Sequence, residues 1–283
     1  MIIVDLSQVM ISNLMMQLGN HTNTEVEEDL LRHMILNSIR SYNMKFKNEY
    51  GEMIIACDAG NNWRRGIFPY YKANRKKNRE KSELNWSQIF ETLNRVRDEL
   101  KAFFPYRVVH VDGAEADDVI GTLAMNYGDT NEKILILSGD KDFVQLQKYN
   151  NVKQFDPVQK KFRTTNDPDR FIKEHIMRGD NGDGVPNFLS TDNCLVVGER
   201  QKPIASKKLD MWVNQKPEEF CDERMLRGYR RNQQLVDLTF IPNELQKNIW
   251  DEYEAQAGKG RQHLFNYFIE KKLKNLIESI NEF

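Results

Sequence analysis

The sequence lacks the features that mark disulfide-bonded, membrane-spanning and zinc-stabilised proteins. Its cysteines stand at Cys57, Cys194 and Cys221, too few and too scattered for a disulfide framework. None of the five histidines pairs with another histidine or a cysteine at zinc-site spacing. No apolar run reaches the roughly 18 residues of a membrane helix, and the first residues, Met1 to Asp5, lack the basic start of a signal peptide. We therefore expect a protein of the reducing cytoplasm that does not enter a membrane.

A strong net charge is also missing. The 283 residues carry a formal charge of −1, and 40% of them are hydrophobic, which suits one large globular domain or a main domain with a smaller partner. The charge is unevenly distributed, however. Segment 63–81 holds one acid, Glu80, and eight basic residues: Arg64, Arg65, Lys72, Arg75, Lys76, Lys77, Arg79 and Lys81. Acids gather elsewhere, and this separation suits a protein that holds phosphates with cations and divalent metal ions with carboxylates.

Apolar runs alternate with helical patterns over the first half of the chain. The runs predict strands at 2–4, 53–57, 106–111 and 133–137, and helical periodicity predicts helices at 25–46, 85–104 and 114–127. Asn85 is expected to cap the second of these helices. The alternation predicts an α/β fold with a mainly parallel central sheet flanked by helices. Strand signals fade after about residue 165. We therefore expect an α/β domain over 1–178 and a smaller helical domain over 179–283.

Acidic residues follow the predicted strands. Because the carboxyl ends of parallel strands meet at one edge of a sheet, these acids are expected to converge there. The candidates come from four strand ends and from a glycine-rich loop: Asp5, Asp58, Glu115, Asp117, Asp118, Asp140, Asp142, Asp180 and Asp183. Magnesium prefers oxygen ligands, and two ions about 3.5–4 Å apart can stabilise a phosphoryl displacement. The pattern as a whole predicts such a metal site.

Simpler interpretations of the same residues remain open. A single aspartate at a strand end is commonly a helix cap or a turn residue. The basic segment 63–81 can be a solvated loop, although its aromatic residues also suit stacking on unpaired bases. Near the C-terminus, Leu273, Leu276, Ile277 and Ile280 form one apolar stripe. That stripe, and the apolar residues of 262–268, are explained either by core packing or by docking on a partner protein.

Three motifs resemble those of the flap endonuclease and 5′–3′ exonuclease family. Glu115-Ala116-Asp117-Asp118 is similar to the family's Glu-Ala-Asp-Asp helix start, Gly139-Asp140-Lys141-Asp142 to its Asp-x-Asp motif, and Gly179-Asp180-Asn181-Gly182-Asp183 to its Gly-Asp-x-x-Asp loop. Asp5 and Asp58 stand where the family has its first two strand-end aspartates. All nine acids match in the correct order, and the resemblance implies a PIN-like 5′ nuclease fold with a helical, DNA-binding C-terminal domain.

The resemblance also implies roles for these residues. Two Mg²⁺ ions, for which Mn²⁺ would substitute, are expected on eight carboxylates. Asp5, Asp58, Glu115, Asp117, Asp140 and Asp142 would hold the first ion, and some of these with Asp180 and Asp183 the second. Lys72, Arg75 and Asp118 are expected to be catalytic, since Lys72 and Arg75 match a Lys-x-x-Arg pair that contacts the scissile phosphate. Segment 60–84 would form an arch over the site, with nucleic acid bound by Arg64, Arg65, Tyr71, Lys76, Lys77 and Arg79.

The likeness extends furthest to the phage ribonuclease H branch of that family. It runs through Trp63-Arg64-Arg65 and Tyr70-Tyr71-Lys72 to the terminal residues 279–283. It implies a monomeric phosphodiester hydrolase of the host bacterial cytoplasm that acts on RNA–DNA and DNA duplexes with 5′ ends or flaps. The expected task is removal of RNA primers from lagging-strand fragments during phage DNA replication. Expected partners are the phage single-stranded DNA-binding protein and the sliding clamp.

One departure and three rival functions accompany this interpretation. After Gly184-Val185-Pro186 the Gly-x-Gly of the cellular enzymes is absent, which leaves their potassium site in doubt here. A non-catalytic branched-DNA binder and a replisome adaptor could share the fold. A phosphatase is disfavoured, because its Asp-x-Asp would follow the first strand, where Asp5-Leu6-Ser7 stands instead.

Overall fold

The structure is a computed structural model that describes residues 1–18, 27–80 and 84–283. The start of the predicted helix at 25–46 and residues 81–83 of the predicted arch lie outside these ranges. The side chains of Lys76 and Lys77 also lie outside the description, so their predicted contacts with nucleic acid stay predictions.

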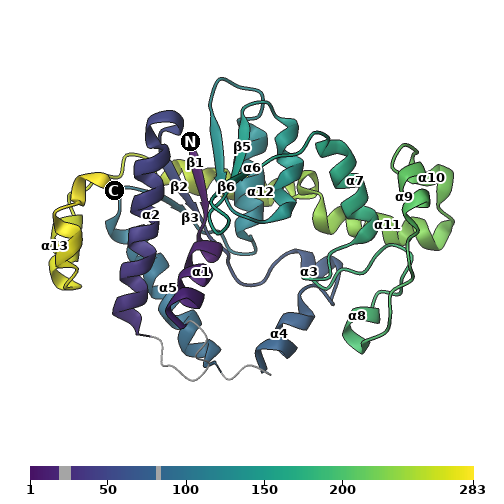
Figure 1. Ribbon diagram of the computed structural model, residues 1–283, viewed down its shortest axis with the longest axis horizontal. Coiled ribbons are helices and arrows are strands. Elements are labelled where there is room, and N and C mark those ends of the chain that lie inside the picture. The colour runs from purple at the N-terminus through teal and green to yellow at the C-terminus, as the bar shows by residue number, and fades with distance from the viewer. Residues whose placement is uncertain (19–26, 81–83) are drawn as a thin grey trace.

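A six-stranded sheet forms the centre of the molecule (Figure 1), in the order β3-β2-β1-β4-β5-β6. All neighbours run parallel except β5 and β6, so the predicted mainly parallel sheet is confirmed, with one antiparallel strand at its edge. The last two strands were not predicted, since β5 mixes apolar and polar residues and β6 has three residues, two of them charged. The strands are β1 (Ile2–Asp5), β2 (Met53–Ala56), β3 (Arg107–Val109), β4 (Ile134–Leu137), β5 (Val152–Asp156) and β6 (Lys161–Arg163).

Helices cover one face of the sheet with a continuous apolar core. The predicted helix near 85–104 is present as α5, where Ile89, Leu93, Val96 and Leu100 point into this core. Its expected cap is also present, because the Asn85 side chain accepts a hydrogen bond from the Gln88 N–H at 3.2 Å. The elements that contribute to this core are α1 (Leu6–Leu18), α2 (Glu28–Tyr50), α5 (Trp86–Phe103), α13 (Leu264–Glu270), α14 (Lys274–Ile277) and η3 (Ile280–Glu282).

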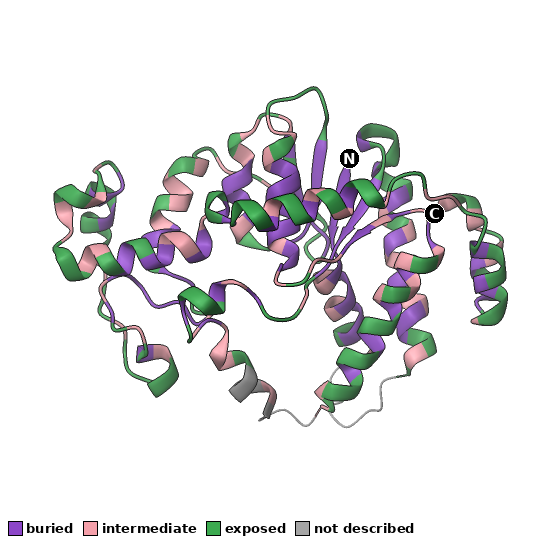
Figure 2. Ribbon diagram, turned by 180° about the vertical axis from the view of Figure 1, so that it is seen from behind, coloured by how far each residue is buried: buried purple, intermediate pink, exposed green. Residues whose placement is uncertain are grey.

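A second core lies on the opposite face of the sheet. Figure 2 shows the strands and the inward sides of the helices as buried, with the outward sides exposed. This face explains the mainly apolar composition of α6, whose side chains pack between the sheet and α12. Its elements are α6 (Ala116–Asn126), η1 (Lys141–Lys148), η2 (Leu238–Phe240) and α12 (Asn243–Ala255).

A third apolar cluster joins Phe68 and Tyr71 to helices of the C-terminal part. Together with the segment after β2, these elements make the helical side of the molecule, seen around α7 and α11 in Figure 1. The remaining helices are α3 (Arg64–Ile67), α4 (Ala73–Glu80), α7 (Pro168–Arg178), α8 (Cys194–Val197), α9 (Ser206–Trp212), α10 (Pro217–Phe220) and α11 (Glu223–Val236). The division of the chain at 178/179 stays a prediction.

The C-terminal apolar stripe packs into the body of the protein. Leu273, Leu276 and Phe283 are buried in the first core, and Ile277 and Ile280 pack against it. The neighbouring segment 262–268 likewise places Leu264, Tyr267 and Phe268 in that core. The structure therefore favours core packing over partner docking for both segments. None of the described helices is both long and apolar enough to span a lipid bilayer.

Candidate functional site

Two aspartates lie at the ends of neighbouring central strands. Asp5 is the last residue of β1, where the Ser138 hydroxyl donates to its Oδ2 at 3.0 Å and the Gln8 N–H to its Oδ1 at 3.1 Å. Asp58 follows β2, and its Oδ1 accepts the Ala116 N–H at 2.8 Å. The side chain of Asp58 therefore joins the end of β2 to the start of α6, bringing two strand ends together as the sequence predicts.

The N-terminus of α6 supplies a second group of acids. Glu115 caps the helix in a reciprocal box, because the Glu115 N–H donates to Oδ2 of Asp118 at 2.8 Å. Asp118 has no exposed surface, and Arg64 holds it through contacts of 2.8 and 3.1 Å. Asp117, between these two, projects from the first turn of the helix and remains partly exposed.

The end of β4 leads into the Asp140 and Asp142 pair. Oδ1 of Asp140 accepts the Asp142 N–H at 3.0 Å, which starts η1 and sets the two side chains close together. The Asp140 N–H in turn donates to the Ser138 hydroxyl at 3.1 Å, and the same hydroxyl donates to Asp5. Ser138 thus links the acids of β1 and β4, a role that the sequence alone did not reveal.

A tight loop carries Asp180 and Asp183. Gly179 has a φ of +66°, and a side chain there would meet the carbonyl oxygen of Val185 at 2.4 Å, so only glycine fits. The Asp180 and Val185 backbones pair as an isolated bridge with N–O distances of 2.7 and 2.8 Å. Oδ1 of Asp180 accepts the Gly182 N–H at 2.7 Å, which holds the carboxylate at the loop.

The basic segment after β2 is fastened to this loop. The Lys72 N–H donates to the Asp183 carbonyl at 2.7 Å, and its ammonium lies 2.5 Å from Oε1 of Glu115. Arg75 donates to Oδ1 of Asp183 at 2.5 Å. The Lys72 and Arg75 side chains therefore lie against Glu115 and Asp183, and their contact with a scissile phosphate stays a prediction.

Burial and the charges of neighbouring acids raise the pKa values of four carboxylates of the site. Burial, with the charges of Asp58 and Asp140, raises the pKa of Asp5 to about 7. Burial, then Asp140, raises the pKa of Asp117 well above its usual value, and desolvation with Asp142 raises the pKa of Asp140. Burial also raises the pKa of Asp183, against the opposing charges of Lys72 and Arg75. Such crowding favours binding of a cation.

Two carboxylates of the group are held charged by nearby cations. Burial alone would raise the pKa of Glu115, but the charges of Lys72 and Arg64 outweigh it and lower that pKa. Burial would also raise the pKa of Asp180, but the hydrogen bond from Lys141 outweighs it and lowers that pKa. The protein's own cations therefore neutralise part of the acidic edge.

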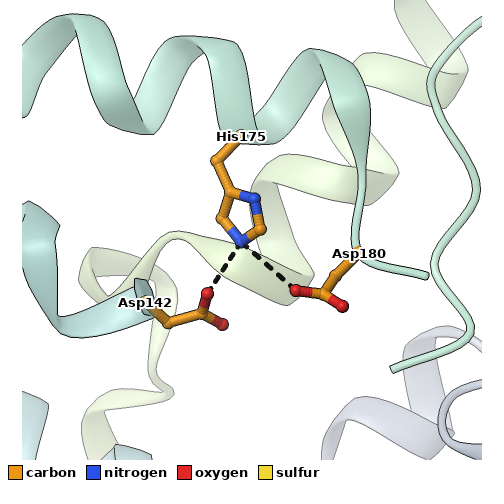
Figure 3. A group of neighbouring side chains, drawn as sticks. All are labelled: Asp142, His175 and Asp180. Carbon is orange, nitrogen blue, oxygen red and sulfur yellow. Dashed lines mark ion pairs between the residues drawn. The ribbon is translucent and has the colours of Figure 1, made fainter. Parts of the chain in front are cut away.

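A histidine that sequence reasoning set aside completes one corner of the site. His175, in the last turn of α7, places its Nε2 3.0 Å from Oδ1 of Asp142 and 3.8 Å from Oδ2 of Asp180 (Figure 3). The three ligand atoms lie within 4.8 Å of one another. Its position five residues before Asp180, in the stretch that leads into the glycine loop, is the sequence signal that could have revealed it.

Comparison with known proteins identifies the family. A model of the 5′–3′ exonuclease N-terminal, resolvase-like domain matches residues 2–176, and a model of the T4 RNase H C-terminal domain matches residues 167–283. The ribonuclease H of Enterobacteria phage T4 is 33% identical over 99% of this chain and 95% of its own. The chain belongs to the 5′–3′ exonuclease family. Like the members of that family, it is a nuclease and thus a phosphodiester hydrolase.

Solved structures support the fold of this 5′–3′ exonuclease family member. A T5 protein co-crystallised with metal ions has a TM-score of 0.66 at 17% identity, covering 90% of this chain and 98% of that one. A bacteriophage T5 flap endonuclease in a pseudo-enzyme–product complex with DNA and metal ions has a TM-score of 0.61 at 19% identity, with the same coverage. The PIN-like domain with a helical C-terminal domain is confirmed.

Three residues of this nuclease are too buried for the roles that the sequence predicts. Arg64 and Tyr71 were expected to bind nucleic acid, yet both are 3% exposed. Arg64 is engaged by Glu115, Asp118 and the Leu235 carbonyl, and the Tyr71 hydroxyl donates to Glu115 and Asp183. Asp118 was expected to be catalytic, but its complete burial leaves it no surface for substrate or metal. Arg64, Tyr71 and Asp118 instead hold Glu115 and Asp183 in place through hydrogen bonds and ion pairs.

Other predicted nucleic-acid residues of the nuclease remain accessible. Arg65 is exposed beside the buried Arg64. The Arg79 guanidinium lies 5.6 Å from the ring centre of Phe90. Both cations keep surface that a phosphate or base can reach, so they stay candidates for substrate contacts.

Proposed function

We propose that this nuclease is a Mg²⁺-dependent 5′–3′ exonuclease and flap endonuclease. It acts on RNA–DNA and DNA–DNA duplexes and removes RNA primers from lagging-strand fragments in phage DNA replication. The observation that carries the proposal is the convergence of acids from β1, β2, α6, η1 and the 179–184 loop. The name of the T4 relative supports the ribonuclease activity, and the DNA and metal complex of the T5 neighbour supports flap substrates and metal use.

The acidic edge fits two divalent cations. Carboxylates whose pKa values are raised by burial and by neighbouring acids gain most from a bound cation. We assign the ions to Asp5, Asp58, Glu115, Asp117, Asp140, Asp142, Asp180 and Asp183. When bound, they would supply Lewis-acid activation of water and stabilisation of charge on the phosphodiester. Mg²⁺ suits this oxygen-rich set, and Mn²⁺ is expected to substitute for it.

Lys72 and Arg75 stabilise the charge that develops on the scissile phosphate. Both cations now pair with acids of the site, Lys72 with Glu115 and Arg75 with Asp183. When a substrate phosphate enters, Lys72 and Arg75 can leave their carboxylate partners and pair with the phosphate instead. Because both side chains are already directed toward the acids, little reorganisation is needed when the charge forms.

A cleft beside Asp58 suits the single-stranded 5′ end. Its volume is about 670 Å³, and it lies between α1, the basic segment and α5. Arg75 and Arg79 offer cations to the backbone, and Trp86 and Phe90 offer rings on which bases can stack. Cys57 and Asp58 also line the cleft, so an unpaired strand bound there would pass beside one of the acids.

A second, basic groove beside the 179–182 loop suits the duplex. It adjoins the 179–182 loop, has a volume of about 650 Å³, and is lined by Lys141, Arg178, Arg200 and Lys202. Cations grouped in this way neutralise backbone phosphates without reading base sequence. The 5′ end would then bind beside Asp58 and the duplex beside Asp180.

The remaining parts of the proposal rest on the family alone. They are partnership with the phage single-stranded DNA-binding protein and the sliding clamp, a monomeric state, and a place in the host bacterial cytoplasm. Size-exclusion chromatography with each purified partner tests the first two.

A cleavage assay tests the activity. A 5′-labelled RNA–DNA hybrid and a 5′-flap duplex are incubated with the full chain, with Mg²⁺ or with EDTA. We expect short 5′-phosphorylated products with Mg²⁺ and intact substrate with EDTA. Cleavage that persists in EDTA, or intact substrates in every metal at equal DNA binding, would refute the proposal.

A further inference from the structure

We propose that His175 is a metal ligand of this chain and, with Asp142 and Asp180, forms a mixed nitrogen–oxygen site that prefers Mn²⁺ or Co²⁺ over Mg²⁺. This inference rests on the proposed function, in which the carboxylates bind divalent cations. It adds a ligand type that the carboxylate motifs do not contain.

The three side chains are arranged to chelate one ion. Figure 3 shows the Nε2 edge of His175 directed into the space between the two carboxylates. The Nε2 atom lies 3.0 Å from Oδ1 of Asp142 and 3.8 Å from Oδ2 of Asp180. Ligand atoms that each lie about 2.1 Å from a shared ion are roughly 3–3.5 Å apart. The two distances from Nε2 lie close to this range, and the three ligand atoms all lie within 4.8 Å of one another.

The Nε2 atom is buried without a hydrogen bond. The His175 side chain is 5% exposed. Within residues 1–18, 27–80 and 84–283, neither Nε2 nor Oδ1 of Asp142 has a hydrogen-bond partner, although the two atoms are 3.0 Å apart. A neutral imidazole can direct the lone pair of its Nε2 atom at a cation held between the two carboxylates. A buried polar atom without a partner is costly, and a metal ion removes that cost.

Neighbouring residues hold the imidazole in this orientation. The ring of Phe171, one turn earlier in α7, stacks on it with centroids 5.8 Å apart and planes inclined by 30°. The Gly179 N–H donates to the His175 carbonyl at 2.8 Å, so the end of the helix fixes both His175 and the Asp180 loop. A ligand set held before binding loses little entropy when the ion enters.

Lys141 places a positive charge next to this site. Its ammonium lies 2.7 Å from Oδ2 of Asp180, the same oxygen that faces His175. An incoming ion must displace this ammonium, which is half exposed and free to turn toward solvent. Lys141→Gln is therefore expected to raise the affinity for Mn²⁺, while His175→Gln lowers it.

The imidazole determines the metal preference. Oxygen ligands alone suit Mg²⁺, whereas imidazole nitrogen favours transition ions, with affinity rising from Mn²⁺ through Co²⁺. One site of this nuclease would then bind a transition ion at concentrations where the all-carboxylate position holds Mg²⁺. The two positions would differ in selectivity although they share neighbouring acids.

Pulsed electron paramagnetic resonance of bound Mn²⁺ tests the ligand directly, without any turnover. The full chain is loaded with Mn²⁺ in the presence of excess Mg²⁺. We expect modulation from a coordinated ¹⁴N nucleus in the wild type and its loss in His175→Gln. His263→Gln, which alters an exposed histidine, should keep the signal. Titration should show a Mn²⁺ affinity about 10–100-fold lower in His175→Gln.

A second measurement needs no variant. Wild-type protein with ¹⁵N-labelled histidine should change the modulation from the ¹⁴N to the ¹⁵N pattern. Mn²⁺ spectra without any nitrogen coupling, in a protein that cleaves flaps, would overturn the role of His175 and leave the proposed function standing. Absence of divalent-dependent cleavage together with absence of Mn²⁺ binding would remove the proposed function itself.

Discussion

The ammonium of Lys72 lies 2.5 Å from Oε1 of Glu115, which joins the basic segment after β2 to the acid that opens α6. Lys72 adopts a left-handed backbone with a φ of +56°, and its N–H is tied to the Asp183 carbonyl. A lysine rarely adopts this conformation without a compensating contact. The backbone bond to the 179–184 loop fixes where the side chain points, toward the acids.

Replacing Lys72 tests the role of that cation. In Lys72→Ala we expect kcat on a 5′ flap to fall by about 10²–10³, the usual cost of removing one well-placed charge stabiliser. KM should change much less, because other cations hold the duplex. The matched control is Lys160→Ala, which removes an exposed lysine with a similar φ of +53° far along the chain. An equal loss in both variants would mean that backbone strain, not charge, explains the effect.

Asp140→Asn separates catalysis from binding. Asp140 interacts electrostatically with Asp117, Asp142 and Asp183, so its carboxylate is central to the acidic edge. We expect cutting to be abolished and affinity for a flap duplex, measured by fluorescence anisotropy in Ca²⁺, to stay within a few-fold of wild type. Asp112→Asn, at an exposed acid, serves as the control. Wild-type turnover in Asp140→Asn would exclude Asp140 from the mechanism.

Replacing Arg64 and Arg65 separately distinguishes a cation that stabilises the fold from one that contacts the substrate. Arg64→Met leaves Asp118 buried without its ion-pair partner, and breaking a buried pair costs about 3–5 kcal/mol in the free energy of unfolding. Arg65→Met, at the exposed neighbour, should change that energy by less than about 0.5 kcal/mol. Urea denaturation measures both. If Arg65→Met instead weakens DNA binding and lowers its salt dependence, Arg65 contacts phosphate.

Metal-free protein should lose stability as the pH rises. The pKa of Asp5 is about 7 in the folded chain against an ordinary value of 3.8. The folded state therefore retains a proton on Asp5 that the unfolded state releases, so the contribution of Asp5 to the free energy of unfolding falls as pH rises from about 4 to about 7 and levels off above. At about 1.4 kcal/mol per pKa unit, the Asp5 contribution reaches at most about 4.5 kcal/mol.

Denaturation in EDTA at a series of pH values measures this effect. Asp5→Asn should flatten the decline between pH 4 and 7, and Asp112→Asn should leave it unchanged. Saturating Mg²⁺ should also flatten it in the wild type, because a cation relieves the repulsion. Identical pH profiles for the wild type and Asp5→Asn would show that Asp5 is not the group responsible.

The sequence predicted those features that depend on local pattern and chain order. Apolar runs such as 134–137 predicted the parallel strands. Because the carboxyl ends of parallel strands lie at one edge of a sheet, the acids directly after these runs were expected to meet there. The Asn85 cap followed from its residue type and position. Strands β5 and β6 escaped prediction because an edge pair needs no apolar run, and β6 has exposed residues on both faces.

The burial of single side chains could not be predicted in the same way. Arg64 and Arg65 are adjacent and chemically identical, yet Arg64 is enclosed by Asp118 and the Leu235 carbonyl, 171 residues away, whereas Arg65 faces solvent. His175 lies near Asp142 because α7 packs on η1, a contact that no spacing rule contains. Long-range packing decides which members of a basic or acidic cluster can reach a ligand.

A crystal soaked in Mn²⁺ and measured at the manganese absorption edge tests the central claim most directly. We predict anomalous density between the carboxylates of Asp5, Asp117, Asp140 and Asp142, with ion–oxygen distances of roughly 2.0–2.3 Å. Carboxylates spread over separate surfaces, with no anomalous peak among them, would contradict the metal site and the nuclease mechanism built on it.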